Sequence, residues 1–392
     1  MGETNNKLLV MLNVVVLIAG FTQGMILTVL SVIMQNNGAS SSLIGLHATG
    51  MYIGILLIAF FVEKFIFHFG YRNNLLIGIA LVIIALILLP FFQIMSIWFV
   101  LRIVIGIGVM LLQISGQSWM SEITPKKNRG FILSVFGACF GAGFALGPLM
   151  INVLSYSVYL PFLLSAALYS LAFFGISRFV NKYPHQDATE NLANTSSARF
   201  YKALKLGWIA FLCPLIFGLM EATLNGVFPA YGIQIGYSPK VISLLISSFA
   251  LGSIIFQIPI GKMSDYIGRF KILSILVSLG ALCFVGLIIF EESLLAVFIL
   301  LSLSGVFVGT LFSLGISFMA DILPAYLLPA GSIICSIFYS AGSIGGPLVS
   351  GGIIDMNDQI SIFYIFLFGL LILLFSLFIF KRTTGNRLAE LE

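Results

Sequence analysis

The residues of this chain that could do chemistry are ionisable and amide side chains inside long apolar stretches. Glu221 lies in one such stretch, and Asn225 follows it by one helical turn. A carboxylate in apolar surroundings can exchange protons near neutral pH, as proton coupling requires. Glu221 could instead be a permanent counter-ion to Arg102 or recognise a cationic substrate. All three roles remain open from the sequence.

Arg102 lies well inside another apolar stretch. A charge there costs at least about 2.5–3.5 kcal/mol, so its side chain should face protein or water. Helical spacing puts it on one stripe with Gly106, Gln113 and Gln117, and such a stripe indicates an inward-facing path. In the alternative interpretation, Arg102 only ties helices together through backbone carbonyls.

The elements that position these residues must be membrane helices. Of the 392 residues, 60% are hydrophobic and 8% are charged, against about 25% charged in an ordinary soluble domain. The four cysteines lie in apolar runs without CxxC spacing, so no metal site is expected. Twelve stretches are long and apolar enough to span a bilayer, which predicts an all-α membrane protein: residues 8–34, 42–62, 74–92, 96–120, 131–153, 158–178, 206–232, 240–260, 272–290, 293–319, 330–354 and 360–380.

The distribution of lysine and arginine predicts the orientation. With the N-terminus in the cytoplasm, all of the 19 basic residues lie in cytoplasmic segments except Lys240 and the intrahelical Arg102. Both termini are therefore expected in the cytoplasm. The net charge of +5 follows from this asymmetry, so no nucleic acid partner is expected. We expect a multi-pass monomer in the cytoplasmic (inner) membrane, with the lipid bilayer and a small-molecule substrate as partners.

The two halves of the chain repeat each other at an offset of 198 or 199 residues. This predicts an N-terminal six-helix bundle over 1–180, a cytoplasmic linker over 181–205, a C-terminal bundle over 206–380 and a cytoplasmic tail over 381–392. Such repeats are typical of transporters that bind solute between two bundles. Gln23 is the first-half equivalent of Glu221, which favours a shared central cavity. The matches are Gly38, Gly54 and Gly70 with Gly236, Gly252 and Gly268, and Glu122, Pro125, Gly147 and Pro148 with Asp321, Pro324, Gly346 and Pro347.

A charged loop carries a resemblance to a known family. Residues 261–271 have the form G-x-x-x-D-x-x-G-R-x-K, which resembles the loop motif of the major facilitator superfamily. Gly261 is expected to allow a close helix approach, Gly268 a tight turn, and Asp265 a hydrogen bond from Arg269. Residues 102–108 are similar to the family's R-x-x-x-G-x-G motif. The resemblance covers essentially the whole chain and implies two pseudo-symmetric bundles.

In that family each loop motif packs against the opposite bundle, and here the two resulting contacts differ. The first half has Phe67 where the second has Asp265, and the second has Leu328 where the first has Arg129. We therefore expect one apolar contact and one charged latch that closes the inside gate. The latch would consist of Glu122, Arg129, Asp265 and Arg269.

The fifth and eleventh predicted spans, residues 131–153 and 330–354, share a glycine–proline pattern. Gly143, Gly147 and Pro148, with Gly346 and Pro347 in the second half, resemble the family's antiporter motif G-x-x-x-G-P-x-x-G-G. The terminal pair in the span 131–153 is instead Ile-Asn. Small residues four apart allow tight helix crossing, and proline allows a kink. The motif is associated with exporters that exchange substrate for protons, and generic tight packing is the alternative explanation.

These observations favour a secondary transporter. The leading hypothesis is a proton-coupled antiporter that exports a small amphipathic compound, with the proton gradient as energy source and no cofactor. The alternatives are a symporter or facilitator that imports a metabolite or organic anion through Arg102, and a non-transporting sensor. The sequence contains no HExxH, GxSxG, Walker A or CxxC motif, so neither a catalytic site nor an enzyme is expected.

Overall fold

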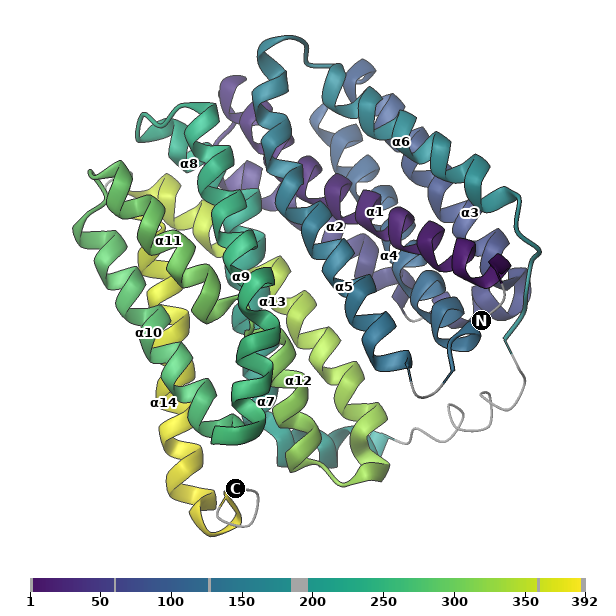
Figure 1. Ribbon diagram of the computed structural model, residues 1–392. Helices are drawn as coiled ribbons and strands as arrows, with labels where there is room; N and C mark the ends of the chain where they lie inside the picture. The colour runs from purple at the N-terminus through teal and green to yellow at the C-terminus, as the bar shows by residue number, and fades with distance from the viewer. Residues whose placement is uncertain (1–2, 60, 126–127, 185–196, 358–359, 389–392) are drawn as a thin grey trace. The chain divides into compact units, whose positions relative to one another are not determined.

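The computed structural model describes residues 3–59, 61–125, 128–184, 197–357 and 360–388 (Figure 1). Every regular element within these residues is a helix. Twelve helical segments are long and apolar enough to cross a membrane, which confirms the predicted number. Helices suit this environment because each satisfies its backbone hydrogen bonds internally, where lipid offers none.

The chain divides into two compact units. The first contains α1 to α6 together with the start of α9, Gly236–Leu244. The second contains α7 to α14 together with Ser40–Gly45, the segment that begins α2. Each unit thus incorporates a short piece of chain from the other half of the sequence.

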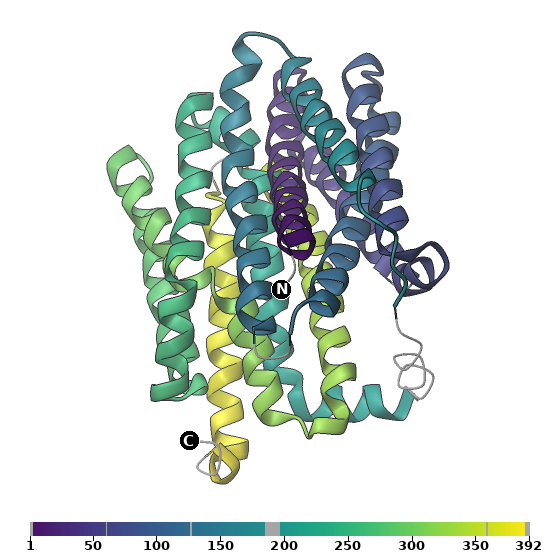
Figure 2. The same cartoon turned by 45° about the vertical axis from the view of Figure 1, so that its right-hand side comes forward.

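In the first unit, α1 lies along α5, and α3 lies against both α4 and α6 (Figures 1 and 2). The 3₁₀ helix η1 continues α5 and also packs on α1. The elements are α1 (Glu3–Asn36), α2 (Ser41–Ala59), α3 (Val62–Phe91), α4 (Met95–Ile123), α5 (Arg129–Leu146), η1 (Gly147–Ser155) and α6 (Leu160–Ser177).

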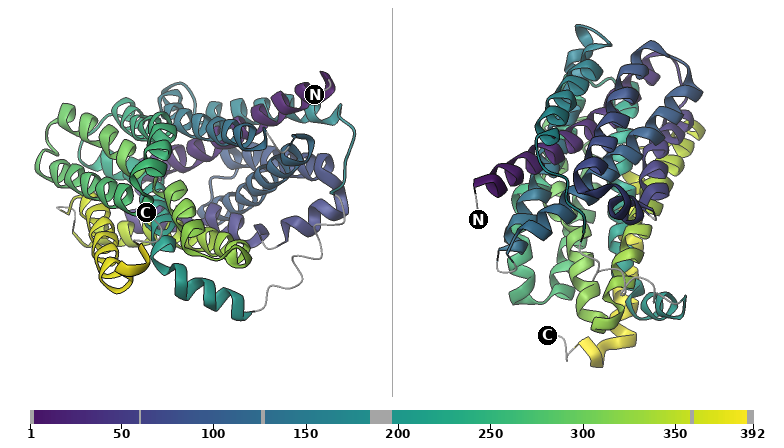
Figure 3. Two further views of the ribbon diagram at one scale, coloured as in Figure 1. Left: turned by 60° about the horizontal axis from the view of Figure 1, so that its bottom comes forward. Right: turned by 90° about the vertical axis from the view of Figure 1, so that its right-hand side faces the viewer.

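In the second unit, α7 lies along α13 and α12, and α10 lies beside α11 and α14 (Figure 3). The elements are α7 (Ser197–Gly226), α8 (Phe228–Gln234), α9 (Pro239–Ile267), α10 (Arg269–Ile289), α11 (Leu294–Val308), α12 (Leu311–Ile322), η3 (Ala325–Leu327), α13 (Leu328–Met356) and α14 (Phe363–Leu388).

The first turn of α2 is joined to α13 within the second unit. The backbone N–H groups of Ser41 and Ser42 donate to the two carboxylate oxygens of Asp355, both at 2.8 Å. A helix leaves its first N–H groups without intrahelical partners, and here one side chain satisfies two of them. Glycine allows the close approach, because a Cβ at Gly45 would overlap the carbonyl of Pro347.

Left-handed backbone occurs at four described positions, all glycines, and they form two pairs 198 residues apart. Gly38 and Gly236 precede α2 and α9, with φ of 76° and 88°. Gly70 breaks α3 at φ 78°, and Gly268 separates α9 from α10 at φ 97°. Side chains with a Cβ disfavour this conformation, so the repeat seen in sequence is also a repeat of backbone turns.

Three predicted spans are interrupted in the structure. The segment 131–153 leaves α-helical geometry at Gly147, next to Pro148, whose nitrogen carries no hydrogen to donate. The segment 206–232 divides into α7 and α8 at Val227, one residue after Gly226. The segment 293–319 divides into α11 and α12 at Gly309.

The predicted linker and tail also differ in part from the observed elements. Residues 185–196 and 389–392 lie outside the described residues. Residues 197–205, expected to be linker, form the first turns of α7, which turn away from the rest of that helix (Figure 2). Asn181 is bound to the α3 break, since its side chain donates to Phe69 O and accepts from Arg72 N. Most of the expected tail continues α14.

Candidate functional site

The α7–α13 crossing brings two backbones into contact through glycines. A Cβ at Gly342 would overlap the carbonyl oxygen of Leu215, and one at Gly218 would overlap the carbonyl oxygen of Tyr339. Gly346 lies against Leu219 in the same way. The glycine–proline pattern of the predicted span 330–354, which lies in α13, therefore makes a close crossing, as small residues four apart allow.

This crossing places Glu221 beside Tyr339. The Tyr339 hydroxyl donates to Oε2 of Glu221 at 2.7 Å. Asn225, buried at 2% exposure, donates its side-chain amide to the backbone carbonyl of Glu221 at 2.8 Å. Among the described residues, Tyr339 is the side chain shown hydrogen-bonding the Glu221 carboxylate, so a phenol and a carboxylate form one polar pair.

Aromatic rings surround this pair. The Tyr339 ring is stacked on Phe217 at 6.3 Å between centroids and meets Phe312 edge-on at 5.3 Å. Phe217 and Phe312 also contact each other at 6.2 Å. All three rings are only half-buried. Such rings offer large apolar contact surfaces, so the site can pair one carboxylate with an apolar ligand body.

The α1–α5 crossing of the first unit repeats this backbone frame, in which glycines bring two helix backbones into contact, but it carries different side chains. A Cβ at Gly20 would overlap the carbonyl oxygen of Phe140, and one at Gly143 would overlap that of Leu17. Gln23 occupies the position of Glu221, and Phe140 the position of Tyr339. Gln23 is 3% exposed, and its Oε1 has no hydrogen-bond partner among the described residues.

Arg102 is enclosed within the first unit at 1% exposure. Helix α4 is pressed against α2 there, because a Cβ at Gly106 would overlap the carbonyl oxygen of Met51. None of the three guanidinium nitrogens has a hydrogen-bond partner among the described residues. The interpretation in which Arg102 ties helices together through backbone carbonyls therefore finds no support.

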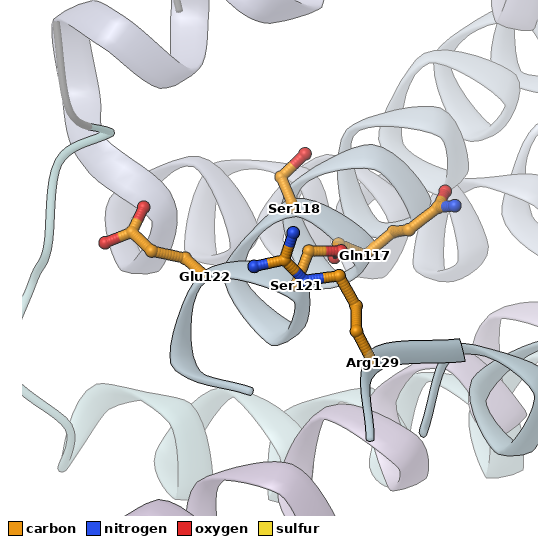
Figure 4. Close-up of a pocket in the computed structure, with 5 residues that line it drawn as sticks. All are labelled: Gln117, Ser118, Ser121, Glu122 and Arg129. Carbon is orange, nitrogen blue, oxygen red and sulfur yellow. Dashed lines mark hydrogen bonds between the residues drawn. The ribbon is translucent and has the colours of Figure 1, made fainter. Parts of the chain in front are cut away.

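The polar stripe of α4 runs from this buried end to an open end. Gln113 is half-buried, and Gln117 is exposed. Gln117 lines a pocket of about 400 Å³ at the end of α4 and the start of α5 (Figure 4). The structure thus brings together three predicted residues, Gln117, Glu122 and Arg129, and adds two serines. The complete lining is Gln117, Ser118, Ser121, Glu122 and Arg129.

The second-unit loop forms its own charge network. Arg269 donates to Asp265 at 3.2 Å, to Asp321, and to the backbone carbonyl of Ser317 at 2.8 Å. Among the described residues of the second unit, nothing lies within 4 Å of a Cβ built at Gly261, so no close approach is seen there within this unit. The charged latch between the two halves stays a prediction.

Two tyrosines are the main residues that sequence reasoning missed. Tyr339 bonds Glu221, and Tyr71 donates to Oε2 of Glu122 at 2.8 Å. A signal for Tyr339 was present, because it precedes Gly342 by three residues and so shares the helical face that meets α7. Tyr71 could have been found from the repeat, since it aligns with Arg269 at the offset of 198.

Comparisons with known proteins agree with this architecture. Residues 12–218 and 210–390 both match the Major Facilitator Superfamily. The chain therefore belongs to this superfamily of secondary transporters. It is 40% identical over 350 residues to the uncharacterized MFS-type transporter YfkF of Bacillus subtilis, covering 88% of each chain. It is 22% identical over 364 residues to Multidrug resistance protein 2 of the same bacterium, covering 88% of this chain and 87% of the relative.

Solved transporters share the fold at low sequence identity. A point mutant of the nucleoside transporter NupG superposes with a TM-score of 0.75 at 15% identity, over 95% of this chain and 99% of that one. A D-xylose–proton symporter superposes with a TM-score of 0.73 at 16% identity, over 94% and 96%. These similarities establish the fold, and they leave the solute undefined.

Proposed function

We propose that this transporter is a proton-coupled antiporter that exports a small amphipathic organic compound. The observation that carries the proposal is the Glu221–Tyr339 pair inside a spanning helix crossing, with Phe217 and Phe312 around it. A carboxylate inside a membrane span is costly and is a functional-site candidate for that reason. The surrounding rings suit an apolar ligand.

One carboxylate can couple two fluxes by holding one partner at a time. When Glu221 is charged, it accepts from Tyr339 and can also accept from a donor or cationic group of the solute. When Glu221 binds a proton, it loses its charge and its attraction for that group. A site that holds either solute or proton exchanges one for the other, provided that both sides of the membrane reach it alternately.

The enclosure of Arg102 favours this proposal over import of an organic anion. The guanidinium is 1% exposed, so an anionic solute would reach it only after the helices around it rearrange. The 22% identity to Multidrug resistance protein 2 is further support for an exporter. The distribution of basic residues supports cytoplasmic termini and insertion in the cytoplasmic membrane.

The test uses the full chain in proteoliposomes with an imposed pH gradient and a panel of amphipathic solutes. Wild type should move solute against the direction of proton flow. Glu221→Gln should lose gradient-driven transport, because the amide cannot release a proton. Glu292→Gln is the matched control, since Glu292 is exposed in the turn between α10 and α11. Equal gradient-driven transport by wild type and Glu221→Gln would refute the proposal.

A further inference from the structure

The pocket at the junction of α4 and α5 has a lining suited to an anion. Its five residues supply one guanidinium, one carboxylate, one amide and two hydroxyls around about 400 Å³ (Figure 4). Four of the five residues belong to the last two turns of the fourth span, Met95–Ile123, and Arg129 lies just before the fifth, which begins at Phe131. The fourth span has 29 residues, against about 20 needed to cross the hydrocarbon core, so its end reaches the level of the lipid headgroups.

The two charges of this pocket do not neutralise each other. Figure 4 shows the Glu122 carboxylate directed away from the Arg129 guanidinium. Glu122 accepts from Tyr71 of α3 instead. Among the described residues of the first unit, Arg129 makes no hydrogen bond or ion pair, and its Nε is enclosed without a hydrogen-bond partner. A guanidinium group held in this way is available to a ligand.

The equivalent corner of the second unit, where the α9–α10 loop meets the end of α12, contains an acidic loop residue that the corner of the first unit lacks. There Arg269 is paired with both Asp265 and Asp321, so its charge is satisfied locally. In the first unit the positions of Arg269 and Asp265 hold Tyr71 and Phe67. The first corner thus contains a cation, Arg129. The loop position that holds the acidic Asp265 in the second unit holds Phe67 in the first, so this loop offers Arg129 no carboxylate.

We propose that this pocket binds a phosphodiester, with Arg129 as the cation that recognises it. A planar guanidinium binds phosphate oxygens through two parallel hydrogen bonds. Ser118 and the Gln117 amide can donate further, whereas the Ser121 hydroxyl donates to the backbone carbonyl of Gln117 at 2.8 Å. The nearby Glu122 repels a second negative charge, which favours a singly charged diester over a doubly charged monoester.

Two sources could supply this group, a phospholipid headgroup or a soluble phosphodiester. The experiment uses the purified full chain in detergent, titrated with phosphatidylglycerol or with glycerophosphoglycerol, its soluble headgroup. Binding is followed by native mass spectrometry and by the thermal unfolding midpoint. Binding of the lipid alone identifies the membrane as the source, and binding of the headgroup identifies the soluble one.

Arg129→Gln should weaken binding about tenfold or more, because a charge-assisted hydrogen bond contributes about 1.5–3 kcal/mol. Arg129→Lys should recover part of the affinity, since the charge remains without the bidentate geometry. Arg178→Gln is the matched control. It removes the same charge from an exposed position at the end of α6, and should bind as wild type does.

Undiminished binding by Arg129→Gln would overturn the proposal, and is expected if Arg129 serves only in a latch with the opposite bundle. Should Arg129→Gln fail to fold, Ser118→Ala and Gln117→Ala provide the second test. Weaker phosphodiester binding by either variant supports the proposal, and unchanged binding by both overturns it.

Discussion

The two units use the same backbone frame for two different kinds of chemistry. At the α7–α13 crossing, Gly342 admits the neighbouring backbone, and the frame holds a carboxylate against a phenol. At the α1–α5 crossing, Gly143 does the same, and the frame carries the amide of Gln23, with Phe140 at the position of Tyr339. The difference teaches that glycines set the geometry of both halves, while the choice of side chain assigns the ionisable site to one half.

The loop corners differ in the same manner. Arg269 and Asp321 in the second unit correspond to Tyr71 and Glu122 in the first, and each pair is hydrogen-bonded. One contact is therefore an ion pair, and the other joins a phenol to a carboxylate. A contact can thus persist through a duplication while its charge, and with it its response to salt, changes.

The largest expected effect comes from substitutions that disrupt the glycine contacts shared by the two helix crossings. Gly342→Ala and Gly143→Ala should each destabilise the protein by about 3 kcal/mol, because each new methyl group meets a backbone carbonyl that cannot move aside. Thermal unfolding in detergent measures the loss. Gly352→Ala is the control, since nothing lies within 4 Å of a Cβ there. If only one of the two crossings is sensitive, the frames are not equivalent.

The next effect distinguishes the Glu221–Tyr339 pair from its first-unit equivalent, Gln23 and Phe140. Tyr339→Phe removes a hydrogen bond to the charged form of Glu221, so the pH midpoint of transport should move upward by about one unit or more. Proton-driven uptake into vesicles across a pH series measures the midpoint. Phe140→Tyr, the reciprocal change, should leave it in place because Gln23 does not titrate. A midpoint unaffected by Tyr339→Phe would show that this pair does not control coupling.

A smaller effect tests the aromatic surroundings. Phe312→Leu should weaken the apparent affinity for an amphipathic solute roughly two- to tenfold, since an aromatic contact contributes about 0.5–1.5 kcal/mol. Competition between solutes in transport measures the affinity. Gln113→Leu changes the equivalent position of the first unit and should have less influence. A larger loss of affinity in Gln113→Leu than in Phe312→Leu would indicate that the solute binds in the first unit instead.

The smallest effect compares the ion pair in the loop corner of the second unit with the tyrosine–glutamate hydrogen bond in that of the first. Arg269→Gln should reduce stability by about 1 kcal/mol or less, because the Arg269 and Asp321 side chains are 27% and 37% exposed. That loss should shrink in high salt, as expected for an exposed ion pair. Tyr71→Phe should cost a similar amount with little salt dependence. Unfolding midpoints at low and high salt measure both, and identical salt dependence would contradict the distinction between the corners.

The fold could be predicted closely from the sequence because its signals are strong. Runs of about 20 apolar residues define spans, and the repeat at 198 or 199 residues aligns the halves. Breaks within spans were harder to predict. The change of helix type beside Pro148 had a local cause that could be named, whereas the interruption at Gly309 depends on tertiary packing of small residues.

The candidate site was predictable in part. Glu221 and Arg129 stand out as charges in or near apolar runs. Their environments do not follow from spacing, because they depend on which helices cross and on the direction of each side chain. Tyr339 donates to Glu221 from 118 residues away, and Glu122 is bound by a tyrosine 51 residues earlier. Pairs this distant in sequence are defined by packing.

The Asp355 carboxylate at the start of α2 implies an order of assembly. The chain between Ser41 and this carboxylate is 314 residues long, so at ordinary elongation rates the second span waits about 15–60 s for it. During that time two backbone N–H groups must remain hydrated, which keeps this end of the helix at the water boundary. The hydrogen bonds at the start of the second span can therefore form only after translation has passed Asp355, shortly before the last span is made.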